Sequence, residues 1–128
     1  MSPVEAMREH LHPNDIGAWC TLIPLAFEAA RRHGIDLREL RPDSSGRRHA
    51  REGHQSCYGW CRPWSGSVTV CIRFREKDGT WLARQPEHVY LDTLAHELAH
   101  FVNLQHGELH DRATANILTT IQELRRPR

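Results

Sequence analysis

The densest group of residues able to do chemistry lies between Leu94 and Gly107. It contains the pattern His-Glu-x-x-His at His96, Glu97 and His100, and a third histidine, His106, follows ten positions after the first. On an α-helix, residues four apart lie about 40° from each other, so the imidazoles of His96 and His100 can reach one cation. Glu97 is about 100° round the helix from His96, so its carboxylate can stand beside the cation without ligating it. Two nitrogen ligands on one helix and a neighbouring carboxylate predict a zinc hydrolase site.

His106 is the candidate third ligand, but a continuous helix would not bring it to the other two. It would carry this side chain roughly 80° away from His96 and about 15 Å farther along the axis. His106 reaches the same cation only if the helix ends first and the chain turns back. We predict that the helix stops at Asn103 in a left-handed cap and that Gly107 loosens the turn. A water molecule would fill the fourth position and leave the site open for catalysis.

The alternative interpretation is a solvated helix in a chain that holds ten histidines among 128 residues. With this composition, His-Glu-x-x-His is expected by chance roughly 0.06 times. The flanking residues favour a buried helix with two distinct faces. Thr93 shares the ligand face with the two histidines. The apolar positions that recur at helical spacing are Leu91, Leu94, Ala95, Leu98 and Val102.

The spacing from His96 to His106 matches the metzincins, but two features argue against that class. Metzincins carry glycine where this chain has Asn103, and they need a methionine turn after the motif, whereas Met1 and Met7 both precede it. A thermolysin-like site would need a downstream glutamate in a recognisable context, and neither Glu108 nor Glu123 has one.

Four motifs in the segment 57–110 occur in the order of a known family. They are Cys57-Tyr58-Gly59-Trp60-Cys61, the strand-like Gly66 to Phe74, the helix pattern Leu91 to His100, and His106-Gly107. In these motifs the chain resembles the SprT-like and WLM (Spartan-like) zinc metalloproteases. The resemblance implies zinc ligands at His96, His100 and His106 and a general base at Glu97. The chain departs from the family at His110, where an aromatic residue usually packs under the site.

The resemblance also implies a fold and a substrate cleft. We expect an α+β minimal zincin fold, in which a small, mostly antiparallel sheet packs on an N-terminal helix, the motif helix and a C-terminal helix. In zincins the strand before the motif helix commonly forms the upper edge of the cleft and pairs with an extended substrate. Residues 67–75 would be that strand here.

Composition places the chain among globular proteins. With 39% hydrophobic and 26% charged residues, we expect one domain spanning 1–128 with its own core. No apolar run is long enough for a membrane span and no secretory signal is evident, so we expect a cytoplasmic protein. The net charge of +1 gives no general attraction to nucleic acid.

Capping signals and periodicity predict the elements that must position the motif. Ser2 and Glu5 form a capping box for a helix over 2–11, and Asn14 or Asp15 caps a longer helix to Gly34 that Pro24 kinks. Strands are predicted over 35–40 and 67–75, with a polar loop over 42–55 and a short returning strand at 81–82. Pro86 opens the motif helix. A last helix over 108–124 is predicted to bury Leu109, Ala113, Ile117, Ile121 and Leu124.

Several other residues allow two interpretations each. Cys57 and Cys61, with His54 nearby, suggest a second metal site, but reduced thiols are favoured because the spacing is not that of a zinc ribbon. His110 and Asp111 are candidates to orient a ligand imidazole, although Asp111 can equally face solvent. The basic residues of loop 42–55 and of the tail 125–128 can contact DNA or an acidic substrate, but we favour solvated charges. Candidate oxyanion donors are Tyr58, Tyr90 and Arg73.

Three functions are compatible with these residues. The first is a zinc metalloprotease acting on protein or peptide substrates, which the resemblance extends to proteins associated with DNA. The second is a non-catalytic interaction module that zinc stabilises. The third is metal-assisted hydrolysis of a non-peptide amide by the same site.

Overall fold

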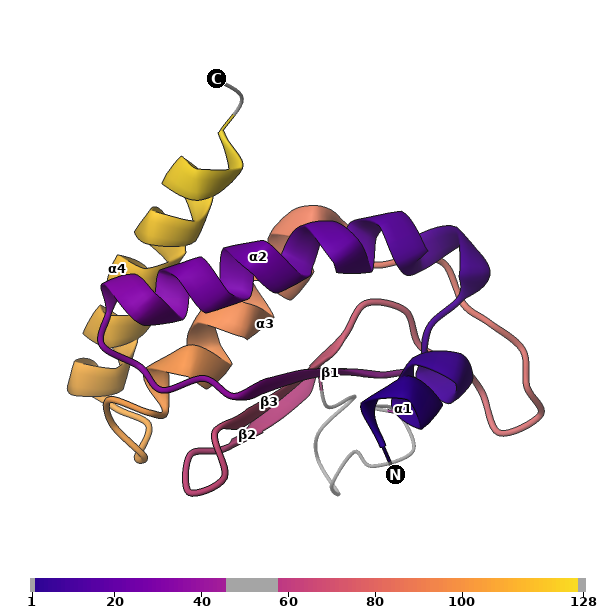
Figure 1. The fold of residues 1–128 in the computed structure, drawn as a ribbon, viewed down its shortest axis with the longest axis horizontal. Helices are drawn as coiled ribbons and strands as arrows, with labels where there is room; N and C mark the ends of the chain where they lie inside the picture. Colours follow the sequence, from indigo (N-terminus) through magenta and orange to yellow (C-terminus); the bar gives the residue numbers. More distant parts are fainter. Residues whose placement is uncertain (1, 46–57, 127–128) are drawn as a thin grey trace.

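The computed structural model describes residues 2–45 and 58–126, and Figure 1 shows their arrangement. The chain has an α+β fold, as predicted. In sequence order the elements are α1 (Pro3–His10), the 3-10 helix η1 (Pro13–Asp15), α2 (Ile16–Arg32), β1 (Glu39–Asp43), β2 (Gly59–Arg62), β3 (Ser67–Cys71), α3 (Glu87–Ala99) and α4 (Glu108–Arg125). The basic cluster of the predicted loop, His54 and Cys57 lie outside the described residues.

The sheet is mixed, so the prediction of a mostly antiparallel sheet was wrong. Its strand order is β1-β3-β2, with β1 parallel and β2 antiparallel to β3. A short hairpin joins β2 to β3 and places β2 along one edge of β3, so β1 pairs with the opposite edge. β3 is therefore the central strand of the described sheet, and β2 is an edge strand. The resemblance had given the edge position beside the substrate cleft to residues 67–75, which include β3.

The strand boundaries also differ from the prediction. β1 begins at Glu39 rather than at Ile35 and continues through Pro42 and Asp43, which were assigned to a loop. Ile35 and Leu37 are buried without joining the sheet, so their alternation reflects burial and not strand pairing. β3 ends at Cys71, and an isolated bridge between Arg75 and Trp81 takes the place of the predicted returning strand.

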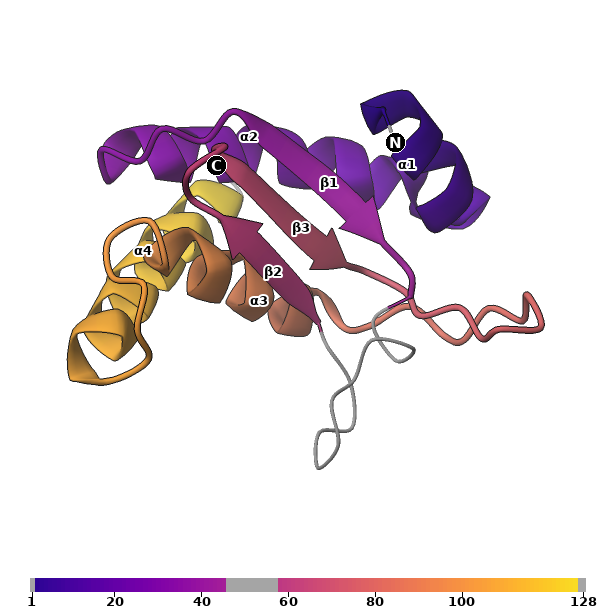
Figure 2. The ribbon, with the colours of Figure 1, turned by 90° about the horizontal axis from the view of Figure 1, so that it is seen from below.

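α2, α3 and α4 lie on one side of the sheet. Figure 2 views the sheet from the opposite side, with α2, α3 and α4 behind the strands and α1 beside β1. α3 packs on β2 and β3, and α4 packs on both α3 and α2. The core therefore joins residues from distant parts of the chain, among them Trp19, Leu22, Val68, Val70, Leu94, Leu98, Ile117 and Ile121. No helix in the described ranges has the length and apolar character needed to cross a membrane.

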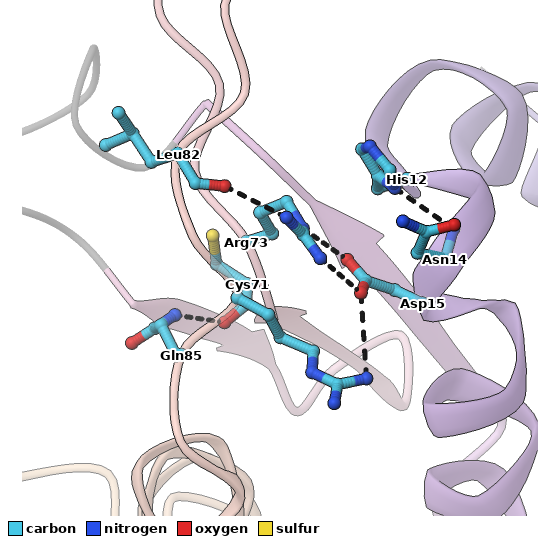
Figure 3. Close-up of polar contacts among 8 residues, drawn as sticks. His12, Asn14, Asp15, Cys71, Arg73, Leu82 and Gln85 are labelled. Atoms are coloured by element: carbon cyan, nitrogen blue, oxygen red, sulfur yellow. Dashed lines mark hydrogen bonds and ion pairs between the residues drawn. The ribbon is translucent and has the colours of Figure 1, made fainter.

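The helix starts confirm one capping prediction and correct the other. Ser2 and Glu5 form the expected capping box of α1. Asp15 stands at the N-cap position of α2, but its carboxylate makes no cap hydrogen bond. It accepts instead from Nε and Nη2 of Arg73 at 2.8 and 2.9 Å, and Arg84 lies 3.7 Å away (Figure 3). This buried ion pair ties the beginning of α2 to the segment after β3.

Two predicted core positions prove to be exposed. Leu109 is 64% exposed, because α4 turns His110, Ile117 and Ile121 toward the core instead. Val102 is 60% exposed, because α3 ends before reaching it. Pro24 lies within α2 and does not end it, and Gly34 follows the helix with a φ of 67°.

Candidate metal centre

The end of α3 determines where His106 can go. The helix ends at Ala99, not at Asn103, and no non-glycine residue in the described part of the chain has a positive φ. The left-handed cap predicted at Asn103 was therefore wrong. The N–H groups of Phe101 and Val102 bond to carbonyls three residues back, at 3.1 and 3.0 Å, which tightens the chain into a turn. Oδ1 of Asn103 then accepts from the Gln105 N–H at 3.1 Å and continues the reversal.

This turn brings His106 back to the helix histidines. Its Nε2 lies 3.1 Å from Nε2 of His96. The ring centroids of His96, His100 and His106 are 4.8 to 5.0 Å apart. For zinc–nitrogen bonds of about 2.0–2.1 Å at tetrahedral angles, two ligand nitrogens lie about 3.3 Å apart and their ring centres roughly 5 Å apart. The three imidazoles are thus spaced as ligands of one ion would be, and the prediction that they meet is confirmed.

A fourth imidazole, that of His110, completes the cluster from α4. The four histidines together lie close enough to hold a metal ion. His110 is 1% exposed, and its ring stacks on His100 with centroids 4.2 Å apart and planes 27° apart. Its Nε2 lies 3.0 Å from the backbone carbonyl of His96, so this nitrogen carries the proton and donates it. The sequence indicated an orienting role for His110, and the resemblance placed this position under the site, whereas helical spacing put Leu109 on the buried face.

The surroundings of the cluster favour the neutral form of the two helix imidazoles, His96 and His100. Burial, followed by the neighbouring histidines, lowers the pKa of His96 to about 4. Burial likewise lowers the pKa of His100. Nδ1 of His100 lies 3.3 Å from the carbonyl oxygen of Asn103, and donation to this oxygen leaves Nε2 with a free lone pair. Neutral imidazoles with fixed tautomers are suited to bind a cation.

Glu97 stands beside the cluster without a partner. Its side chain belongs to a residue that is 7% exposed, and no described residue forms a hydrogen bond or ion pair with the carboxylate. Burial raises its pKa to about 7. A carboxylate that titrates near neutral pH can accept a proton at that pH and release it again.

Gly59 lets β2 approach α3 next to this carboxylate. A Cβ atom at Gly59 would lie 2.6 Å from the Thr69 carbonyl oxygen, 2.8 Å from Cγ2 of Thr93 and 3.5 Å from Cγ of Glu97. Any larger residue would therefore move β2 away from the helix. Cys61 lies two positions after Gly59 in β2. Burial, followed by the charge of Glu97, raises the pKa of Cys61 to about 12, which keeps the thiol protonated.

A cleft of about 680 Å³ opens next to His96 and Glu97. Tyr58 borders it, whereas Arg73 is bound to Asp15 and the buried Tyr90 lines a different pocket. Of the three candidate oxyanion donors, Tyr58 is thus the one placed at the cleft. The residues lining the cleft are Tyr58, Gly59, Asp92, Thr93, His96, Glu97, Asp111, Thr114, Ala115 and Leu118.

The structure gives no second group of metal ligands among residues 2–45 and 58–126. The four-histidine cluster is the group found there. Cys20, Cys61 and Cys71 are free thiols. The proposed second site at Cys57 and His54 lies outside the described residues.

Comparisons of the chain with protein-family models, with curated proteins and with solved structures find no match. Function is therefore inferred from the residues of the site and their geometry.

Proposed function

We propose that the chain is a zinc-dependent metallopeptidase in which His96, His100 and His106 hold the metal and Glu97 is the general base. The observation that carries the proposal is the meeting of these three imidazoles beside a buried carboxylate that has no partner in the described part of the chain. Three imidazole nitrogen donors suit zinc, which binds three histidines in open catalytic sites. When bound, zinc supplies Lewis acidity and lowers the pKa of a water molecule to about 7.

Glu97 performs the proton transfers in this proposal. Its carboxylate accepts the proton of the attacking water and passes it to the leaving amine of the peptide bond. A pKa of about 7 favours both steps at neutral pH, because the group is neither a strong acid nor a strong base there. The shielding of the carboxylate from solvent keeps bulk water from competing for the proton.

The substrate chain is proposed to lie along β2. β2 is one of the two edge strands of the described sheet, and its first residue, Gly59, borders the cleft together with Tyr58. An extended peptide bound beside a strand through backbone groups is held with little side-chain selectivity. This assigns to β2 the role that the resemblance had given to residues 67–75.

One observation favours the second candidate, a zinc-stabilised interaction module. Four imidazoles meet in the cluster, and a metal held by four protein ligands is characteristic of structural sites. Donation from Nε2 of His110 to the His96 carbonyl leaves its Nδ1 able to ligate. We favour three ligands because the His110 ring stacks on His100 with centroids 4.2 Å apart, closer than the roughly 5 Å expected for two tetrahedral ligands of one ion. Three ligands leave a position open for chemistry.

The deciding experiment pairs metal analysis with a proteolysis assay on a denatured protein, with and without single-stranded DNA. We expect the purified chain to bind one zinc and to cleave the substrate. Glu97→Gln should bind the same amount of zinc and lose at least about 100-fold in cleavage rate. Glu87→Gln is the matched control, because Glu87 is exposed at the start of the same helix and pairs with Arg125.

The outcomes separate the candidate functions. A chain that binds zinc and cleaves no protein under either condition would favour the interaction module, unless it hydrolyses small non-peptide amides. A chain that takes up no zinc would exclude all three. Cleavage that appears only with DNA present would support substrates associated with DNA.

A further inference from the structure

The cleft at the metal centre continues along the seam between α3 and α4. At one end lie His96 and Asp111, and at the other lie Asp92 and Leu118. Asp92 and Leu118 also border the neighbouring pocket, so the groove extends beyond this end. Its walls between the ends are mostly apolar or carry methyl groups, with Thr93 from α3 and Thr114, Ala115 and Leu118 from α4.

The charges of this cleft are all of one sign. Asp92, Glu97 and Asp111 line it, and no lysine or arginine does. The carboxylates of Asp92 and Asp111 are exposed and have no hydrogen-bond or ion-pair partner among the described residues. Glu97 adds evidence for a ligand, because its side chain lines the same cleft and has no partner among residues 2–45 and 58–126, although the residue is 7% exposed.

We propose that this cleft binds a lysine or arginine side chain of the substrate, next to the bond that is cleaved. The inference rests on the proposed function, because it takes the occupant to be a polypeptide. Lysine and arginine combine a long aliphatic stem with a cationic end. The stem would lie against Thr93, Ala115 and Leu118, and the cation would meet the carboxylate of Asp92 or Asp111. Acidic side chains would be repelled by the same carboxylates.

The test compares three fluorescent peptides that differ at one position, which holds arginine, norleucine or glutamate. Binding is measured by fluorescence anisotropy on the full chain before metal is added, and cleavage is measured after zinc loading. Because the two aspartates are exposed, they are expected to improve binding of the arginine peptide by about 2- to 5-fold over the norleucine peptide. The glutamate peptide should bind most weakly.

The variants Asp92→Asn and Asp111→Asn identify the carboxylates responsible. Each is expected to reduce the preference for arginine over norleucine, and the double variant should abolish it. Asp36→Asn is the matched control: it makes the same change in net charge at an exposed aspartate that pairs with Arg38 and does not line the cleft. It should leave the preference unchanged.

The two readouts separate this inference from the proposed function. Preferential binding of the arginine peptide without cleavage would refute the peptidase and leave the cationic pocket standing. Cleavage with equal affinity for all three peptides, or an arginine preference that survives the double variant, would overturn the pocket and leave the peptidase. Failure of every peptide to bind would overturn the pocket as well.

Discussion

Nε2 of His110 donates a hydrogen bond to the backbone carbonyl of His96, 3.0 Å away, and so joins the first turn of α4 to the last turn of α3. The same imidazole stacks on His100. One buried side chain thus touches both helix histidines of the candidate metal centre. Its position implies that α4 holds the two ligand rings in place, which the first prediction tests.

Replacing His110 with phenylalanine should weaken metal binding without removing it. The variant keeps a ring to pack on His100 but loses the hydrogen bond to His96. Loss of an orienting partner is expected to reduce zinc affinity by about 10-fold or more and to lower stability by about 1–2 kcal/mol. Competition with a zinc chelator and thermal unfolding measure the two effects.

The matched control for this variant is His88→Phe, because His88 is an exposed histidine of α3 outside the cluster. Unchanged zinc affinity in His110→Phe would show that His110 does not position the ligands. Complete loss of zinc would instead identify His110 as a ligand and support the interaction module.

Gly59→Ala should separate β2 from α3 at the cleft. The added Cβ would collide with the Thr69 carbonyl oxygen, which is backbone and cannot rotate away. We expect a loss of about 2 kcal/mol in the free energy of unfolding, in the range typical of overpacking, together with reduced peptide cleavage. Chemical denaturation gives the first quantity and the proteolysis assay the second.

Gly17→Ala is the control for this substitution, because nothing lies within 4 Å of a Cβ at Gly17 in α2. It should be neutral or stabilise the helix by up to about 1 kcal/mol. If both alanine variants have the stability of the wild type, the close approach of β2 to Glu97 does not exist in solution.

The pH dependence of stability in the metal-free protein should carry the signature of Glu97. Burial raises the pKa of Glu97 from 4.5 to about 7, so the folded state keeps a proton that the unfolded chain releases. This contribution makes the protein less stable as the pH rises from about 4.5 to about 7, by at most roughly 3 kcal/mol. His96 acts oppositely over an overlapping range, because burial lowers its pKa from 6.5 to about 4.

Comparison with Glu97→Gln isolates the contribution of Glu97. Glutamine does not titrate, so the variant should gain stability relative to the wild type as the pH is raised through this range. Thermal unfolding from pH 4.5 to 8 measures the difference, with Glu87→Gln as the control at an exposed glutamate. If the stability of the wild type and of Glu97→Gln changes with pH in the same way, folding does not raise the pKa of Glu97.

Asp15→Asn should destabilise the fold far more than the loss of a surface ion pair. The Asp15 side chain is 1% exposed and accepts two hydrogen bonds from Arg73, whose guanidinium would be left without a counter-charge. The expected loss is about 3 kcal/mol, as for a broken buried pair. Asp36→Asn, which breaks the exposed pair with Arg38, should change stability by less than about 1 kcal/mol. Equal effects in urea denaturation would contradict a structural role for the Asp15–Arg73 pair.

Some elements could be predicted from the sequence because their signals are local. The capping box at Ser2 and Glu5, the proline that opens α3 and the helical spacing of His96 and His100 each depend on residues within a turn or two of one another. The sequence also required the chain to turn back before His106, because a continuous helix would have carried this residue away. These patterns predicted the cluster of three histidines that the structure brings together.

Other features were decided only by packing between distant segments. β2 has a weak strand pattern and is ordered by pairing with β3, and the parallel pairing of β1 depends on which edge of β3 the hairpin leaves open. The rotation of α4 against α3 determines that His110 is buried and Leu109 exposed, although either fits the helical period. The sequence by itself thus determined which residues could ligate a metal, because ligand spacing is a local property. The tertiary structure decided what surrounds them, because the burial of Glu97 and the fourth imidazole arise from contacts that no local pattern encodes.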